Sequence, residues 1–224
     1  MHVTALEGHR NWAASYDAVP NPLLALETRL LLERLSPLRA PCFLDIACGT
    51  GRWMLLARQC GSRVFGVDFC PEMLFQASRK PGLAGCLSVA DACRIPFSDG
   101  AADLTLCSFA LGYLPSVQQA IAEMARVSRR GGRVVVSDLH PSALAAGWTR
   151  SFRSDGQLYE IDHYRQQIAA WEAAAESAGL ALEWRLEASF SEPERDIFRQ
   201  AGKESSFSEL SRIPALLAMS WIKS

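Results

Sequence analysis

The sequence predicts an α/β fold in which a mostly parallel sheet is covered by helices on both faces. Short apolar runs, several of them ending in an acid, alternate along the chain with segments whose apolar residues recur at helical spacing. One run, residues 133–139, contains three consecutive valines, as expected for a strand that is buried on both sides. With 224 residues, 49% of them hydrophobic, the chain can bury one full core, and we expect a single domain.

The composition disfavours several classes of partner. The formal net charge is -1 and the isoelectric point about 6.4, so no long-range field attracts nucleic acid or an anionic membrane. Neither a run of eighteen apolar residues nor a basic and then apolar leader occurs, and we expect a cytoplasmic protein. The seven cysteines are scattered without a C-x-x-C pair, which predicts small buried hydrophobes in a reducing compartment and no metal site.

The first strand, residues 43–46, and the turn after it are the stretch around which the other elements are placed. Gly49 and Gly51 break the apolar run, and a helical pattern follows over residues 52–60. Glycine removes the Cβ where the chain turns sharply and where a ligand approaches the backbone, so this is a candidate cofactor loop. A dinucleotide-binding turn has another glycine three residues after the second one, and Met54 occupies that position. A nicotinamide-dependent reductase stays an alternative.

The residues FLDIACGTG resemble motif I of the class I S-adenosylmethionine-dependent methyltransferases. Ordered motifs extend the resemblance over roughly residues 11–140. It implies a Rossmann-like sheet of seven strands, mostly parallel, with an antiparallel last strand. It also implies S-adenosylmethionine as cofactor and S-adenosylhomocysteine as product. The positive sulfonium and the ribose and adenine hydrogen-bond groups suit a site with carboxylates at strand ends.

Three acidic residues stand at such strand ends, namely Asp45, Asp68 and Asp91. Asp68 comes 19 positions after Gly49, where a carboxylate accepts hydrogen bonds from both ribose hydroxyls. The resemblance assigns the adenine amino group to Asp91 and a ring nitrogen to the backbone of Ala92. It further implies cofactor contacts for Tyr16, Ala47, Gly49, Gly51, Phe69, Met73 and Phe109. For Phe69 and Met73, within the stretch GVDFCPEML, packing at a helix start is the alternative.

The N-terminal region is expected to hold two helices, over residues 11–17 and 22–35, while residues 1–10 show no pattern. The W-x-x-x-Y-D stretch is similar to a helix that folds over the cofactor in small-molecule methyltransferases. Trp12 and Tyr16 lie four apart on one helical face, so core packing explains them equally well. Within the one domain we expect N-terminal lid helices (1–40), a cofactor-binding core (41–140), and a substrate-side insertion with closing strands (141–224).

The spacing of apolar residues and the positions of turn residues also predict the later elements. We expect helices over residues 118–127 and 164–177 and strands over 180–190 and 215–222. Residues 192–211 are polar and form either a hairpin connection or a short helix over the site.

The acceptor is expected to be a small molecule with an oxygen, nitrogen or carbon nucleophile. In residues 141–163 the apolar residues recur with no helical or strand period. This segment follows the fifth strand, where family members vary with substrate. Four aromatic side chains are predicted to line the acceptor site: Trp12, Tyr16, Trp148 and Phe152. The chain lacks an Asn-Pro-Pro-Tyr motif and a basic composition, which argues against nucleic-acid methylation. A SAM-binding protein without catalysis stays open, and we expect a monomer or homodimer.

Two histidines are candidates for the catalytic proton acceptor. His140 is the first choice because it follows the fifth strand directly, and imidazole titrates in the range useful for deprotonating a hydroxyl, phenol or amine. His163 is the reserve. The alternative for His140 is a structural cap at the strand end, held by Pro141, and the alternative for His163 is a helix cap beside Asp162.

Overall fold

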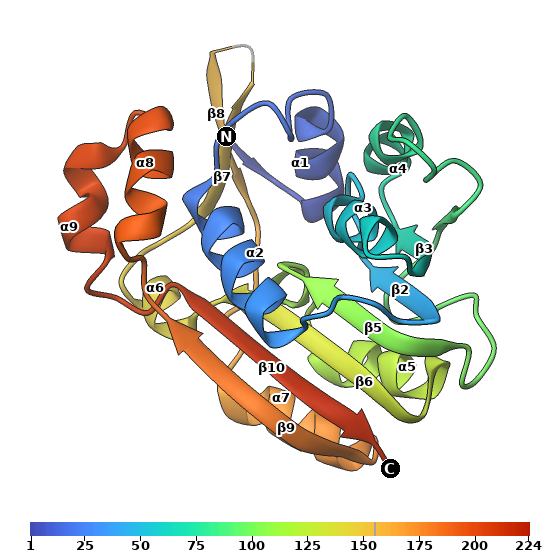
Figure 1. Cartoon of the computed structure of the whole chain (residues 1–224). Helices are drawn as coiled ribbons and strands as arrows, with labels where there is room; N and C mark the ends of the chain where they lie inside the picture. Colours follow the sequence, from blue (N-terminus) through green and yellow to red (C-terminus); the bar gives the residue numbers. More distant parts are fainter. Residues whose placement is uncertain (155) are drawn as a thin grey trace.

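The computed structural model describes residues 1–154 and 156–224 and has the predicted α/β architecture (Figure 1). The strands of its main sheet are β2 (Cys42–Ile46), β3 (Arg63–Asp68), β4 (Leu87–Val89), β5 (Ala102–Ser108), β6 (Ser128–Leu139), β9 (Leu180–Ala188) and β10 (Leu216–Lys223). They lie in the order β4-β3-β2-β5-β6-β10-β9. Neighbours are parallel except at β10, which is antiparallel to β6 and β9. The predicted seven-stranded sheet with its antiparallel last strand is confirmed.

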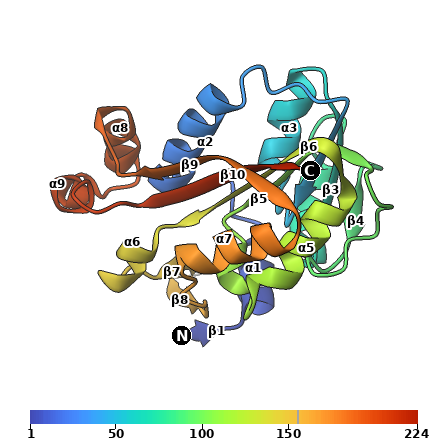
Figure 2. The ribbon, with the colours of Figure 1, turned by 90° about the horizontal axis from the view of Figure 1, so that it is seen from below.

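Helices cover both faces of this sheet. The helices after residue 20 are α2 (Pro22–Arg34), α3 (Arg52–Gln59), α4 (Pro71–Ser78), α5 (Val117–Val127), α6 (Pro141–Ala145), α7 (Ile168–Ser177), α8 (Glu192–Gln200) and α9 (Phe207–Leu210), with the short turns η1 (Leu111–Tyr113) and η2 (Glu204–Ser206). Successive strand side chains point to opposite faces, so Leu44 and Val134 pack with α5 and α7, whereas Phe43 and Val135 pack with α2 and α3. Figure 2 shows these two helix pairs on opposite sides of the sheet. With both faces covered, the carboxyl edge of the strands is left for a ligand.

The N-terminal residues are more ordered than their lack of pattern predicted. β1 (His2–Val3) pairs with β8 (Gln157–Ile161), which pairs with β7 (Arg150–Ser154) in a second sheet. The first helix, α1 (Ala5–Trp12), replaces the one expected over residues 11–17. A capping box starts it, because Thr4 Oγ1 accepts from the Glu7 amide at 3.3 Å while the Glu7 carboxylate accepts from the Thr4 amide at 3.1 Å. The N-terminal segment and the substrate-side insertion therefore form one structural unit.

Three other expectations are refined. Helix α7 begins at Ile168 rather than at residue 164. The segment 192–211 is helical, as α8, η2 and α9, rather than a hairpin connection. Helix α2, expected to be part of a lid, buries Leu26 and Leu31 completely and therefore packs as a core helix. Residue 155, inside the expected insertion 141–163, lies outside the described residues. Within the described part, no helix is both long and apolar enough to cross a bilayer.

Candidate functional site

A cavity of about 490 Å³ lies along the edge of the main sheet where the central strands end. One side of it, called here the carboxylate wall, consists of Ala47, Gly49, Asp68, Phe69, Met73, Asp91 and Ala92. The other side, the aromatic wall, consists of Leu23, Leu139, Trp148, Phe190, Phe198 and Leu210. The cavity has the size of a small-molecule site and joins elements from the whole chain. Every predicted cofactor residue lines it except Asp45 and Gly51.

The glycine turn after β2 presents its backbone to this cavity. Gly49 has a φ of +54°, and a Cβ added there would meet no atom within 4 Å. Ala47 has a φ of +56° although it is not glycine, and such strained residues concentrate at ligand sites. Gly51, with a φ of +79°, serves packing, because its added Cβ would lie 2.7 Å from Leu83 Cδ1. The turn is therefore shaped both for a ligand above it and for close contact below it.

Asp45 lies under the turn rather than on the cavity surface. It is 2% exposed, and its carboxylate accepts a hydrogen bond from the backbone of Met54. Burial raises the pKa of Asp45 well above its ordinary value, while the nearby charge of Arg52 acts in the opposite direction. In this structure Asp45 therefore joins β2 to the first turn of α3.

Asp68 closes β3 on the carboxylate wall and binds the turn directly. Its two carboxylate oxygens accept from the Gly49 and Cys70 amides, each at 2.8 Å. Burial raises the pKa of Asp68, whereas the backbone amides of Cys70, Gly49 and Phe69 lower it. Because a carboxylate has about four lone-pair sites, it keeps acceptor capacity for a ligand hydroxyl.

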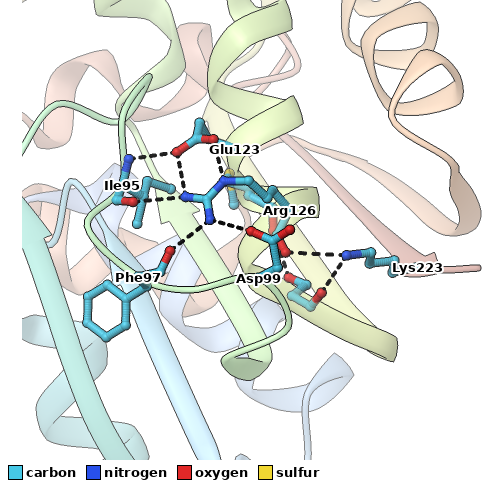
Figure 3. Close-up of polar contacts among 8 residues, drawn as sticks. Ile95, Phe97, Asp99, Glu123, Arg126 and Lys223 are labelled. Carbon is cyan, nitrogen blue, oxygen red and sulfur yellow. Dashed lines mark hydrogen bonds and ion pairs between the residues drawn. The ribbon is translucent and has the colours of Figure 1, made fainter.

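The loop that carries Asp91 and Ala92 is fixed from behind by a polar cluster on α5 (Figure 3). Arg126 donates to the carbonyl oxygens of Phe97 at 2.7 Å and Ile95 at 2.9 Å. Glu123 accepts from the Ile95 amide at 2.8 Å and also pairs with Arg126, which raises the pKa of Arg126. Asp91 itself is exposed, with one carboxylate oxygen on the Cys93 amide at 2.8 Å. The cluster therefore sets the position of the loop, while the Asp91 side chain keeps acceptor capacity.

Three of the four predicted aromatic side chains, Trp12, Tyr16 and Trp148, line the cavity. Trp12 and Tyr16 contact each other, with ring centroids 4.6 Å apart. Burial raises the pKa of Tyr16, so its hydroxyl stays protonated. Phe152 lies behind them, stacked on Trp12 at 4.8 Å, and is not part of the lining. Phe152 therefore supports the Trp12 ring from the side of the insertion.

His9 on α1 faces the cavity and was not predicted. Its Nδ1 lies 2.7 Å from the Ala5 carbonyl oxygen, which can only accept, so Nδ1 carries the proton and Nε2 carries the lone pair. Burial lowers the pKa of His9 and keeps the ring neutral. The capping box and the spacing of His9, Trp12 and Tyr16 on one helical face were the signals that could have identified it.

The two histidines predicted as proton acceptors are held elsewhere. His140 caps α6 by accepting from the Ser142 amide at 3.0 Å through Nδ1, and its Nε2 lies 3.0 Å from a Glu187 carboxylate oxygen. The Nδ1 of His163 lies 3.3 Å from the Ile161 carbonyl oxygen, ahead of α7 rather than at its start. Neither residue lines the cavity. For His140 this is the structural cap that the sequence also allowed.

A buried cation lines the cavity beside the ends of β5 and β6. Arg150 pairs with Asp138, and its Nη1 donates to the Phe109 carbonyl oxygen at 3.3 Å. Burial acts to lower the pKa of Arg150, but the Asp138 carboxylate and the Tyr113 hydroxyl together outweigh it, and the pKa lies above its ordinary value. No local pattern in the aperiodic residues 141–163 distinguishes this arginine, so only the fold identifies it.

A second buried ion pair lies under the cavity floor. Glu27 of α2 has no solvent exposure and pairs with Arg52 at the start of α3. Its carboxylate also accepts from Ser108 Oγ at 2.6 Å, from Trp53 Nε1 at 3.2 Å, and from Ser137 Oγ. Because Ser108 lines the cavity, this network joins α2 and α3 to the floor of the site.

Comparison with known proteins agrees with this geometry. Residues 44–136 match the family model described as "Methyltransferase domain". A demethylmenaquinone methyltransferase from Thermus thermophilus is 41% identical over 103 residues, which cover 44% of this chain and 47% of that protein. The chain thus spans about half the length of this curated relative.

Solved structures share the whole fold. A Haloferax volcanii putative methyltransferase, solved in complex with the Trm112 methyltransferase activator, has a TM-score of 0.68 at 19% identity, covering 98% of this chain and 97% of that one. A geranyl diphosphate C-methyltransferase from Streptomyces coelicolor, solved with Mg²⁺, geranyl diphosphate and S-adenosylhomocysteine, has a TM-score of 0.61 at 16% identity, covering 82% and 72%. At these identities the likeness establishes the fold.

Proposed function

We propose that the chain, whose residues 44–136 match the methyltransferase domain model, is a class I S-adenosylmethionine-dependent methyltransferase that transfers a methyl group to a small apolar acceptor. The observation that carries this proposal is the continuity of one cavity from the carboxylate wall to the aromatic wall. A donor and an acceptor fit side by side there. Such an arrangement converts a reaction between two molecules into one between neighbours held in place.

The carboxylate wall fits S-adenosylmethionine. Asp68 keeps acceptor capacity and would accept from the ribose hydroxyls, and the exposed carboxylate of Asp91 would accept from the adenine amino group. The open space above Gly49 admits a ligand close to the backbone. When bound, S-adenosylmethionine supplies a sulfonium methyl group, which is already a good electrophile.

The remaining lining residues would align the acceptor and exclude water. Trp148 stacks on Phe190 with ring centroids 5.9 Å apart, which makes a flat apolar surface for an acceptor body. His9 is the imidazole of the lining, so we assign to it, rather than to His140 or His163, the removal of any acceptor proton. Residues 1–20 and the insertion would shield both ligands as one unit.

The first experiment is calorimetric titration with S-adenosylhomocysteine and, separately, with NADH. We expect binding of S-adenosylhomocysteine only. Asp68→Ala should weaken it by roughly 2 to 4 kcal/mol, since a charged hydrogen-bond acceptor is lost. Asp196→Ala is the control, because Asp196 is an exposed acid on α8 away from the cavity lining. Equal affinity of wild type and Asp68→Ala would remove Asp68 from the cofactor site, and binding of NADH alone would refute the proposal.

The second experiment tests turnover. Small apolar phenols, amines and carboxylic acids are screened with methyl-labelled S-adenosylmethionine, and labelled product is counted. We expect transfer to at least one class. Tight cofactor binding with no transfer to any class would favour a SAM-binding protein without catalysis.

A further inference from the structure

We infer that the acceptor carries a negative charge beside its apolar body and that Arg150 binds this anionic group. The inference rests on the proposed methyl transfer and names the class of its substrate. It starts from the cations of the cavity lining, Arg150 and Lys203. Among the described lining residues only Asp68 and Asp91 are acidic, and both belong to the carboxylate wall. The acceptor side therefore pairs apolar surface with positive charge and has no carboxylate of its own.

The guanidinium of Arg150 is held in one place. The Asp138 carboxylate, the Phe109 carbonyl and the ring of Tyr113, whose centroid lies 4.7 Å from Cζ, contact it from three directions. The position of this guanidinium requires glycine at residue 112, because a Cβ added to Gly112 would lie 2.5 Å from Arg150 Nη2. A side chain so restrained loses little further freedom when it binds an anion, which favours affinity.

The charge of Asp138 is directed away from the cavity. Its oxygens accept from the Gly112 amide at 2.6 Å, from the Leu139 amide at 2.7 Å and from Arg150, and Asp138 is not part of the lining. A guanidinium has five N–H donors, which exceeds the acceptors that surround Arg150 here. Its Nε finds no acceptor among the described residues. Arg150 is thus anchored by one carboxylate and keeps donor capacity for the oxygens of a second one.

Arg150 belongs to the acceptor side of the cavity. Asp68 is the last residue of β3, and Asp138 is the last but one of β6, which lies three strands away in the order β3-β2-β5-β6. At about 4.8 Å between neighbouring strands, the ends of β3 and β6 lie roughly 14 Å apart along the sheet edge. This spacing separates Arg150 from the expected ribose position. Lys203, exposed between α8 and η2, adds a second cation to the lining, and within residues 1–154 and 156–224 no acid forms an ion pair with it.

The test compares 2-naphthoate with its neutral analogue 2-naphthamide as ligands of the full chain saturated with S-adenosylhomocysteine. Affinities are measured by calorimetry and by quenching of tryptophan fluorescence. We expect naphthoate to bind at least about tenfold more tightly than naphthamide, and Arg150→Met to reduce that ratio to about one. Arg153→Met is the matched control, an exposed arginine on the same strand β7 that does not line the cavity, and it should keep the wild-type ratio.

Arg150→Met leaves Asp138 buried without its partner, so Asp138→Asn/Arg150→Met, which removes both charges, is measured in parallel. Equal affinity for the two probes in the wild type, no binding of naphthoate, or an unchanged ratio in the folded variants would each overturn the inference. A loss of S-adenosylhomocysteine affinity in Arg150→Met with the ratio intact would assign Arg150 to the cofactor carboxylate instead. Failure of the wild type to bind S-adenosylhomocysteine would count against the proposed methyl transfer. The preference for naphthoate over naphthamide is then measured on the protein without S-adenosylhomocysteine.

Discussion

The buried pair of Glu27 and Arg52 offers the sharpest test of how the site is supported. Glu27→Ala removes a carboxylate that is fully buried and that accepts from Arg52, Trp53, Ser108 and Ser137. The substitution leaves the Arg52 guanidinium, whose side chain is only 27% exposed, without its counter-charge. We expect the free energy of unfolding to fall.

The magnitude follows from the contacts. Breaking a buried ion pair by removing one partner costs about 3 to 5 kcal/mol. Counting four donors at about 1 kcal/mol each gives a similar total. The two serine hydroxyls can rotate to other acceptors and Arg52 is partly in contact with water, so we place the loss at about 3 kcal/mol. That is a large share of the roughly 5 to 15 kcal/mol that stabilises a typical domain.

The assay is urea unfolding at neutral pH, followed by circular dichroism and by tryptophan fluorescence to verify a two-state transition. Glu33→Ala is the control, because Glu33 is exposed on the same helix, and it should change stability by less than about 0.5 kcal/mol. Arg52→Ala and the double variant complete a cycle, in which we expect a coupling of about 1 to 3 kcal/mol. If Glu27→Ala costs no more than Glu33→Ala, the network does not hold α2 on the sheet and the reasoning is refuted.

Three further predictions follow from the same structure. Burial lowers the pKa of His9, so the unfolded chain takes up a proton on this ring before the folded chain does as the pH falls through about 6.5. The free energy of unfolding of the wild type should therefore drop toward pH 5 more steeply than that of His9→Phe. Parallel pH profiles of urea unfolding would count against a buried neutral ring. Arg126→Met should weaken S-adenosylhomocysteine binding several-fold by releasing the loop with Asp91, while Arg130→Met, an exposed neighbour, should not; calorimetry decides. The pKa of Asp45 is raised in the folded state, so its charged form opposes folding at any pH above the pKa of the unfolded chain. Asp45→Asn should therefore unfold at a higher urea concentration than the wild type at pH 7.5, and the difference should shrink toward pH 4. An unchanged or lower urea midpoint at pH 7.5 would contradict this.

Local sequence was sufficient for the parts of this protein that depend on neighbours along the chain. The apolar runs, the glycine turn at Gly49 and Gly51, and the acids at the strand ends predicted the parallel sheet and the carboxylate wall, because strand period, turn chemistry and strand-end position are short-range properties. Even the missed helix α1 had a local signal in Thr4 and Glu7.

The acceptor side depended on the tertiary structure. His140 had a plausible position in the sequence, but only the packing of α6 and the Glu187 side chain decides that its ring is a cap. Arg150 belongs to the insertion without a regular apolar period, and its environment is set by Asp138 on β6 and by Phe109, which directly follows β5. A lone charged residue in the sequence shows neither its partner nor its burial. The carboxylate wall could therefore be predicted from the sequence, whereas the pairing and burial of Arg150 required the fold.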